Sequence, residues 1–310
     1  MLSQFSNKNQ SELGKLKTLM KILGIGNAIV DVLCKVTDDF LTKHSLTKST
    51  MKLIDEKEFK KLLSSLEIVE TISGGSVANS IVGLSQMGNT VGFIGKVSDD
   101  ELGQKYEDGL NKEKVKYLYK KKIENIPTGS CLILITPDSE RTMCTFLGTA
   151  GKINDNDVKE DDIRNAEIVF LEGYLWDEGE PKKAFDKAIA HSKKVAMSLS
   201  DLFCVERHKA HFLELVKTKL DIVFANEQEI MSLIDAKTFN NAISFSKEIK
   251  KNIIITRGEK GAISIYGDKV EEINAQSNLK IRDLTGAGDL FAAGYLHGVI
   301  NNFEINKSLE

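Results

Sequence analysis

The chain contains the polar, glycine-rich stretch Asp283-Leu284-Thr285-Gly286-Ala287-Gly288-Asp289, which runs directly into the apolar segment Leu290-Phe291-Ala292-Ala293-Gly294. The apolar residues recur at helical spacing, so the pattern predicts a loop that feeds the N-terminus of a helix. Backbone N–H groups at such a terminus lack an intrahelical partner and attract anions. Gly286 and Gly288 carry no Cβ, which allows an anion to approach the backbone closely.

Asp289 at the end of this stretch has two interpretations. A lone Asp at this place is most simply a helix cap. A carboxylate inside an anion cradle can instead accept the proton of an alcohol that attacks a phosphoryl group. The neighbouring glycines favour the second interpretation.

Bulk composition limits the class of protein. The 310 residues are 41% hydrophobic and 28% charged, which indicates one large α/β domain or a domain with a small appendage. The net charge of −3 and the lack of a basic stripe argue against nucleic-acid binding, and no apolar run is long enough to cross a membrane. The four scattered cysteines indicate free thiols in a reducing compartment, so we expect a cytoplasmic protein.

Strand-like and helical runs alternate along most of the chain, which predicts a mostly parallel sheet with helices on its faces. Residues 1–19 are polar and weakly patterned, and we expect a disordered tail there. The pair Gly24-x-Gly26 follows a buried strand, but a dinucleotide-binding motif needs a third glycine where Ile29 stands. A second strand also follows Asp31, where that fold needs a helix.

Two segments interrupt the alternation. Strands are expected near 32–36 and 50–54, and a hairpin joins runs at 129–136 and 141–147. Together they predict a small β-sheet that stands off the main domain as a lid. We therefore expect a single domain over residues 20–310, with the lid formed by about 32–54 and 115–150.

Several polar residues beside predicted strand ends have simple structural explanations when each is taken alone. Turn or loop formation would account for Asn27, Asp31, Gly74 and Gly75, helix capping for Asn79, Asn226 and Glu229, and a surface charge for Arg141. The chain lacks the G-x-x-x-x-G-K-[ST] sequence, so any ATP is bound without a P-loop.

The order and combination of these motifs resemble the PfkB, or ribokinase-like, family of ATP-dependent sugar and nucleoside kinases, and its adenosine-kinase-like branch in particular. The resemblance runs from about Ile22 to Gly298. It rests on Gly24-x-Gly26-Asn27-x-x-x-Asp31, on Gly74-Gly75-Ser76-Val77-Ala78-Asn79, and above all on Asp283-x-Thr285-Gly286-Ala287-Gly288-Asp289-x-Phe291. It implies a three-layer α/β/α fold with a small β-sheet lid.

The resemblance also implies a role for each matching residue. Asp289 would be the catalytic base, and the N–H groups of Gly286, Ala287 and Gly288 would hold the transferring phosphoryl group. The residues implied to bind substrate hydroxyls are Asn27, Asp31, Gly74, Gly75 and Asn79. Those implied on the ATP side are Asn226, Thr256, Gly258, Gly261 and the lid residue Arg141. Glu229 would organise Mg²⁺ through water, and Asp283 and Thr285 a monovalent cation such as K⁺.

The function implied is transfer of the γ-phosphoryl group of ATP to an alcohol of a nucleoside, the 5′-hydroxyl of adenosine being the first candidate. A nucleoside needs an apolar slot for its base, for which Val36, Cys131 and Phe146 are candidates. The alternatives are a kinase of a sugar or sugar phosphate and a non-catalytic nucleotide-binding protein. The resemblance allows either a monomer or a homodimer that pairs through the lid. Because the chain ends at Glu310, a further helical segment over the adenine is not expected within these residues.

Overall fold

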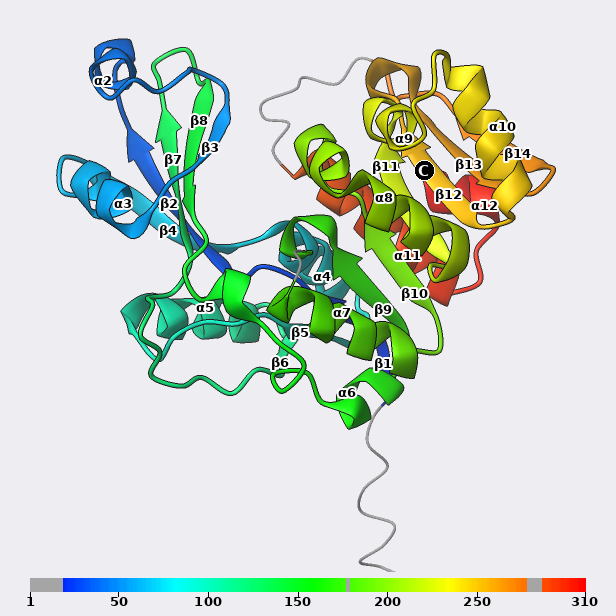
Figure 1. The fold of residues 1–310 in the computed structure, drawn as a ribbon, viewed down its shortest axis with the longest axis horizontal. Helices are drawn as coiled ribbons and strands as arrows, with labels where there is room; N and C mark the ends of the chain where they lie inside the picture. The colour runs from blue at the N-terminus through cyan, green and yellow to red at the C-terminus, as the bar shows by residue number, and fades with distance from the viewer. Residues whose placement is uncertain (1–18, 177–178, 278–285) are drawn as a thin grey trace, which may run out of the picture.

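The computed structural model describes residues 19–176, 179–277 and 286–310. A large, mostly parallel sheet lies between two layers of helices, and a smaller sheet stands away from it (Figure 1). Within the described ranges, none of the helices combines the length and the apolar character needed to cross a bilayer. Apart from Leu19, the segment predicted to be a tail lies outside the described residues.

The large sheet has nine strands in the order β14-β13-β12-β11-β10-β9-β1-β5-β6. Their bounds are β1 (Met20–Ile25), β5 (Val91–Ile94), β6 (Lys116–Tyr117), β9 (Ala166–Glu172), β10 (Val195–Ser198), β11 (Ile222–Asn226), β12 (Asn252–Thr256), β13 (Ala262–Tyr266) and β14 (Lys269–Ile273). Pairing is parallel from β6 to β12, and the β12–β13 and β13–β14 pairs are antiparallel. The inner strands are nearly continuous apolar runs, as expected for strands buried on both faces.

The order of the strands reverses at β1. The chain proceeds from β1 to β5 and β6 on one side, and from β9 to β12 on the other. In open α/β sheets, ligands bind outside the carboxyl ends of the strands at such a topological switch point. Asn27 lies just after β1, and Glu172 is the last residue of β9. The topology therefore predicts a ligand site near this pair.

Helices cover both faces of the large sheet. The described helices are α2 (Asp38–Lys43), α3 (Glu56–Leu63), α4 (Ser76–Gln86), α5 (Glu101–Lys112), α6 (Glu160–Arg164), α7 (Glu180–His191), α8 (Leu202–Thr218), α9 (Glu227–Leu233), α10 (Phe239–Ile249), α11 (Ala287–Ile300) and α12 (Ile305–Leu309). Buried residues of α4, α5, α11 and α12 share one core with the sheet, and those of α6 to α10 share a second.

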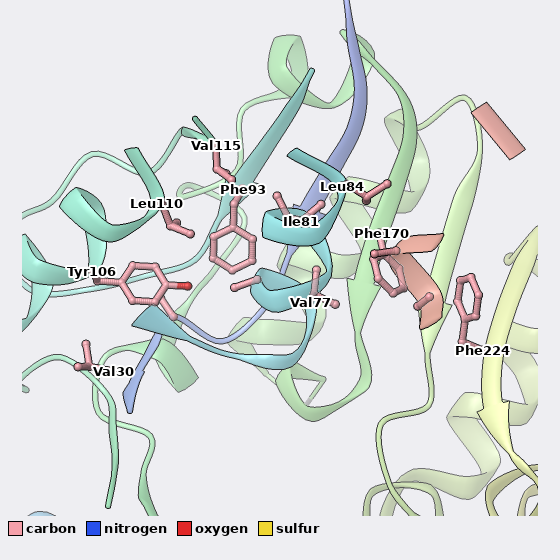
Figure 2. Packing of buried hydrophobic residues seen from close by; sticks show 14 of the residues in the cluster. Val30, Val77, Ile81, Leu84, Phe93, Tyr106, Leu110, Val115, Phe170 and Phe224 are labelled. Carbon is pink, nitrogen blue, oxygen red and sulfur yellow. The ribbon is translucent and has the colours of Figure 1, made fainter. Parts of the chain in front are cut away.

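Helix α4 lies at the centre of the first core. Its Val77 and Ile81 side chains lie beside Phe93 of β5, and Leu84 lies toward Phe170 of β9 (Figure 2). Helices α4 and α11 pack against each other, and Gly83 permits the approach of Leu290 and Ala293. The rigid packing of α4 fixes the position of every polar side chain on its first turn.

The smaller sheet has five strands in the order β3-β8-β7-β2-β4. Their bounds are β2 (Ile29–Lys35), β3 (Met51–Leu53), β4 (Ile68–Gly74), β7 (Ser130–Ile135) and β8 (Arg141–Phe146). One face packs on α2 and α3 through residues such as Val32 and Cys34 of β2. The alternation of β2 places Asp31 on the other face, which α2 and α3 do not cover.

Most predicted elements are confirmed, including the β7–β8 hairpin and the strand after Asp31. The sequence analysis missed β4, an edge strand with largely exposed side chains, and the short strand β14. It also placed residues 116–117 in the lid, which was wrong because they pair with β5 in the large sheet.

Candidate active site

Asp289 lies on the first turn of α11 and is held on both sides by α4. Ser76 Oγ donates to Asp289 Oδ1 at 2.6 Å, and Asn79 Nδ2 donates to Oδ2 at 3.0 Å. Ser80 Oγ donates to the backbone carbonyl of Asp289 at 2.8 Å. Burial raises the pKa of the Asp289 carboxyl, while the bonds from Ser76 and Asn79 act in the opposite direction. The arrangement orients a carboxylate whose affinity for a proton exceeds that of an exposed Asp.

The N-terminus of α11 presents backbone donors without a side-chain cap. Gly286 is the N-cap residue and has a φ of +74°, a conformation that favours glycine. No described side chain caps this helix. A Cβ at Gly288 would meet no described atom within 4 Å, so packing does not require glycine there. Among the described residues, the open space at Gly288 and the N–H groups of this first turn together suit an anion.

Asp31 lies near enough to Asp289 for their charges to interact. Burial raises the pKa of Asp31 to about 7, the Arg141 guanidinium lowers it, and the charge of Asp289 raises it. A Cβ at Gly74 would collide with the Asp31 carboxylate. Asp31 therefore lies near Arg141, Gly74 and Asp289, which agrees with the expectation of a shared site but does not test the role of any of them.

Gly75 joins β4 to α4 at the centre of this site. Its φ is +105°, and a Cβ there would collide with the backbone carbonyl oxygen of Asn27. No side chain of the N-cap residue caps α4, because that residue is Gly75 itself. The amide of Val77 instead donates to Glu172 Oε2 at 3.0 Å. A carboxylate from β9 thus performs the capping that the sequence of α4 does not supply.

Glu172 is the functional residue that the sequence analysis missed. It is 1% exposed, and its Oε1 accepts from the backbone N of Asn27 at 3.3 Å and from Asn27 Nδ2 at 3.0 Å. Burial raises its pKa to about 7, and the N–H donors of Val77 and Asn27 lower it. A Cβ at Gly26 would collide with this carboxylate. The sequence held one signal for this residue: Glu172 is a charged residue at the end of the largely apolar strand β9.

A cavity of about 520 Å³ reaches the site. It runs beside the edge of β4 and between α4 and α5, and its walls include Asn79 of α4 and Gly286 and Leu290 of α11. The phosphate cradle predicted at α11 and the substrate amide predicted on α4 therefore open onto the same space.

The residues predicted on the ATP side lie farther along the same carboxyl edge. Asn226 and Thr256 are direct neighbours in the β11–β12 pair. Asn226 and Glu229 form a capping box, in which the backbone N–H of Glu229 donates to Asn226 Oδ1 at 2.8 Å and that of Asn226 donates to Glu229 Oε2 at 3.0 Å. Burial raises the pKa of Glu229 to about 7. The structural explanation of this pair as a cap is confirmed.

The turn after β12 contains the two predicted glycines. Gly258 and Gly261 have φ values of +57° and +87°. Arg257, which precedes them, pairs with Glu227 at 3.2 Å and stacks over the Phe239 ring at 4.4 Å, which anchors the turn to α9 and α10. The turn is thus fixed in place beside Asn226.

The predicted metal ligands lie only partly within the described residues. Asp283 and Thr285 lie outside them. Among the residues that the structure describes, no three His, Cys, Asp or Glu side chains gather as a metal-binding group. Glu229 uses one lone pair of Oε2 and one of Oε1 within its capping box, so its carboxylate retains acceptor capacity for metal-bound water. This chemistry fits the role of an indirect Mg²⁺ ligand.

The predicted lining of the base slot needs correction. Cys131 pairs with Asp31 across β2 and β7 and lies on the same face. Val36 belongs instead to the core between the small sheet and its helices, and Phe146 packs against Phe59 of α3 with ring centroids 5.8 Å apart. The period of two along the strands sends these two side chains to the covered face.

Comparison with known proteins agrees with this geometry. A family model described as pfkB family carbohydrate kinase matches residues 47–310. Adenosine kinase 2 of Arabidopsis thaliana is 24% identical over 320 residues, which span 93% of this chain and 90% of the relative. A 5-dehydro-2-deoxygluconokinase of Clostridium botulinum is 26% identical over 279 residues, or 83% of this chain and 78% of the relative.

Two solved structures are similar in both fold and sequence. The adenosine kinase of Sinorhizobium meliloti has a TM-score of 0.85 and 34% identity, with 94% of this chain and 91% of that chain covered. A probable sugar kinase of Rhizobium etli has a TM-score of 0.86 and 34% identity, with 94% and 90% covered. The family model covers most of the chain. The chain therefore belongs to the pfkB family of carbohydrate kinases.

Proposed function

We propose that this kinase transfers the γ-phosphoryl group of ATP to the 5′-hydroxyl of a nucleoside, adenosine being the first candidate. The observation that carries the proposal is the carboxylate of Asp289, held by Ser76 and Asn79 at the uncapped N-terminus of α11 and within the electrostatic range of Asp31. A base and an anion cradle on one helical turn are the two groups that phosphoryl transfer to an alcohol requires.

In the proposed mechanism, Asp289 accepts the proton of the attacking hydroxyl. The N–H groups of Gly286, Ala287 and Gly288 take up charge that develops on the transferred group, and one such donor is typically worth about 3 kcal/mol of barrier. Asp31 holds the substrate hydroxyls with Asn27, Gly74, Gly75 and Asn79. Arg141 on β8 approaches the phosphates when the small sheet covers the substrate.

The nucleotide side of the mechanism uses the ends of β11 and β12. Asn226, Thr256, Gly258 and Gly261 position ATP. Glu229 would hold Mg²⁺ through water, and the ion when bound supplies positive charge to the phosphates.

The choice of a nucleoside rests on the small sheet. On the face that carries Asp31, Cys131 packs with Ile29 and Ile133, and the partly buried Leu33, Met143 and Leu147 extend this apolar surface. An apolar surface next to a hydroxyl-binding carboxylate suits a base joined to a ribose. The similarity to the adenosine kinase of Sinorhizobium meliloti supports the same choice.

A sugar or sugar-acid substrate is the second candidate. It is favoured by the similarity to the Clostridium botulinum 5-dehydro-2-deoxygluconokinase and to the probable sugar kinase of Rhizobium etli. A third possibility is a protein that binds ATP without turnover. The substrate screen described below distinguishes it from a nucleoside kinase and from a sugar kinase.

The test is a substrate screen with ATP and Mg²⁺. Adenosine, inosine, ribose, fructose and 5-dehydro-2-deoxygluconate are compared, and 5′-deoxyadenosine serves as the control that lacks the reacting hydroxyl. We expect a 5′-monophosphate from adenosine, identified by mass and by ³¹P NMR. Transfer to a sugar alone would overturn the nucleoside assignment, and ATP binding without transfer to any alcohol would overturn the proposed activity.

A further inference from the structure

The side chain of Asn27 carries a hydrogen-bond acceptor that is buried and unpaired. Asn27 is 4% exposed, and its Oδ1 has no hydrogen-bond partner among the described residues. Its Nδ2 is paired with Glu172 Oε1 at 3.0 Å. Buried polar atoms in folded proteins are nearly always satisfied, so an orphaned acceptor needs an explanation.

Glu172 determines which atom of the Asn27 carboxamide lacks a hydrogen-bond partner. Its carboxylate also receives the backbone N–H groups of Asn27 and Val77, which can only donate. A carboxylate in that position is an acceptor on both oxygens. Above its raised pKa Glu172 is ionised, and if the carboxamide then turned over, Asn27 Oδ1 would face Glu172 Oε1 at hydrogen-bond distance with no proton between the two acceptors. The contact with Glu172 therefore fixes the nitrogen toward β9.

We infer that Glu172 is a positioning residue for the substrate: by binding Asn27 Nδ2 it holds Asn27 Oδ1 as a fixed acceptor, so the substrate group that Asn27 meets must be a hydrogen-bond donor. A hydroxyl or an N–H satisfies this requirement, whereas a carbonyl or a phosphate oxygen does not. This inference deepens the proposed function and rests on it, because it assumes that Asn27 contacts the substrate.

The location of Asn27 supports a ligand as the source of that donor. Asn27 follows β1 at the topological switch point of the sheet, and its backbone carbonyl lies against Gly75. Gly75 is adjacent to Gly74, which contacts Asp31, and to Ser76, which binds Asp289. The unpaired oxygen thus belongs to the same group of residues as the proposed base and the proposed hydroxyl ligand.

The first test needs no variant. The substrate accepted in the screen is compared with its monodeoxy analogues, and with analogues that carry a carbonyl in place of one hydroxyl. We expect one position at which loss of the hydroxyl lowers kcat/KM by about 10- to 100-fold, because the analogue leaves a buried acceptor unpaired, and at which the carbonyl analogue is worse still. Tolerance of a carbonyl at every position would overturn the inference.

The second test removes the fixed orientation. Glu172→Gln offers one donor and one acceptor, so the Asn27 carboxamide is no longer held one way. We expect KM to rise about 10-fold, and the discrimination against the critical deoxy analogue to fall to within about threefold. Glu167→Gln on the same strand is the matched control, because Glu167 pairs with Lys21 at 2.6 Å away from the site. Unchanged discrimination in a folded Glu172→Gln variant would contradict the inference.

A double variant separates orientation from general structural damage. Asn27→Asp alone places two carboxylates together and should lower kcat/KM by at least about 100-fold. When Asn27→Asp is combined with Glu172→Gln, the new amide on β9 donates to the new carboxylate after β1, and an acceptor again faces the substrate. We expect the pair to recover at least about 10-fold over Asn27→Asp, a coupling that additive damage would not produce. Strictly additive losses in the folded double variant would contradict the inference.

A measurement without turnover distinguishes failure of this inference from failure of the proposed function. In protein labelled with ¹⁵N at asparagine, the Asn27 carboxamide protons should exchange slowly in the parent chain and in Glu167→Gln, and rapidly in Glu172→Gln. Equal exchange in all three would contradict the orientation of Asn27 by Glu172. Slow exchange that is lost in Glu172→Gln, in a protein that phosphorylates no alcohol, would support the orientation and contradict only the proposed function.

Discussion

Asp289 combines two properties that a general base needs. Its burial raises the pKa of the carboxyl, so the carboxylate takes a proton more readily than an exposed Asp does. Its bonds from Ser76 and Asn79 keep both oxygens in one orientation. The same donors stabilise the charged form and so oppose the effect of burial on the pKa of this carboxyl.

Asp289→Asn should lower kcat by about 10³-fold with little loss of fold, because general-base catalysis contributes about 10²- to 10⁴-fold. The phosphoryl-transfer rate and the thermal midpoint of unfolding check the two parts. Asp268→Asn, in the β13–β14 turn, is the control. Near-normal turnover by Asp289→Asn would remove Asp289 from the role of base.

Arg141→Gln should move the acid limb of kcat/KM to higher pH. In the proposed mechanism, ionised Asp31 accepts the substrate hydroxyls. Its pKa is about 7, and the Arg141 charge lowers that pKa. Removal of Arg141 therefore raises the pKa of Asp31, and we expect a shift of about one pH unit. Profiles from about pH 5.5 to 9.5 measure it. A uniform loss of activity without a shift of the acid limb would show that Arg141 acts on phosphate alone. Arg164→Gln, on the exposed face of α6, is the control and should change neither kcat/KM nor the position of its acid limb.

At the residue scale, the sequence predicted the groups that motifs mark and missed those that only tertiary contact reveals. Asp31, Gly74, Asn79 and Asp289 stand in recognisable local patterns. Glu172 contacts Val77 across 95 positions of sequence, and no local pattern announces such a bond. A buried glutamate ending an apolar strand was a weaker signal, since strand ends are commonly polar.

Among the elements, the junction of β4 and α4 contributes the most residues to the proposed site. Gly74 admits the Asp31 carboxylate, Gly75 turns the chain, and Ser76 and Asn79 hold the base. Because α4 packs on the face formed by β9, β1 and β5, this turn cannot shift without disturbing the core.

Gly75→Ala and Gly88→Ala separate backbone strain from steric collision. Both glycines have positive φ, +105° and +86°, but a Cβ collides with Asn27 only at Gly75 and meets no described atom within 4 Å at Gly88. Gly88→Ala should lower the free energy of unfolding by about 1–2 kcal/mol through strain alone. Gly75→Ala should lose at least about 1 kcal/mol more and most of the activity. Chemical denaturation measures both, and equal losses would contradict the proposed collision.

Elements with strong periodicity were predicted well, and those that neighbours create were not. Helix α4 and strand β9 have clear patterns in the sequence. Strand β4 is rich in β-branched residues, but it exposes most of its side chains, and its place in the small sheet is set by pairing with β2. Phe146, a candidate for the base slot, packs instead against Phe59, because the face that a strand residue occupies depends on strand pairing that the sequence did not specify.

At the scale of the whole molecule, several carboxyls are buried, one on the small sheet and the others at or near the carboxyl edge of the large sheet. Asp31, Glu172 and Glu229 have pKa values of about 7, and that of Asp289 is also raised. The unfolded chain releases these protons near pH 4, so the folded chain binds more protons between about pH 4.5 and 7. This common burial couples the stability of the protein to pH.

The free energy of unfolding should therefore fall as pH rises from about 4.5 to 7, and level off above about pH 8. For Glu172, whose pKa rises from 4.5 to about 7, the change is on the order of 3 kcal/mol. Urea denaturation across this range tests it. Glu229→Gln should reduce the slope and the exposed Glu101→Gln should not, whereas a stability that increases over the window would contradict the burial of charge.

The α/β class and the second sheet were predictable because alternating strand and helix patterns leave few topologies. The arrival of β9 at the same point, where Glu172 meets Asn27 and Val77, was not, since it depends on the reversal of strand order at β1.

The separation of 213 positions between Ser76 and Asp289 has a consequence for biosynthesis. In the proposed mechanism, the parts that receive the alcohol emerge from the ribosome long before the part that removes its proton. A nascent chain that does not yet include α11 lacks Asp289, so translation delays removal of the proton until α11 has been made and has packed onto α4.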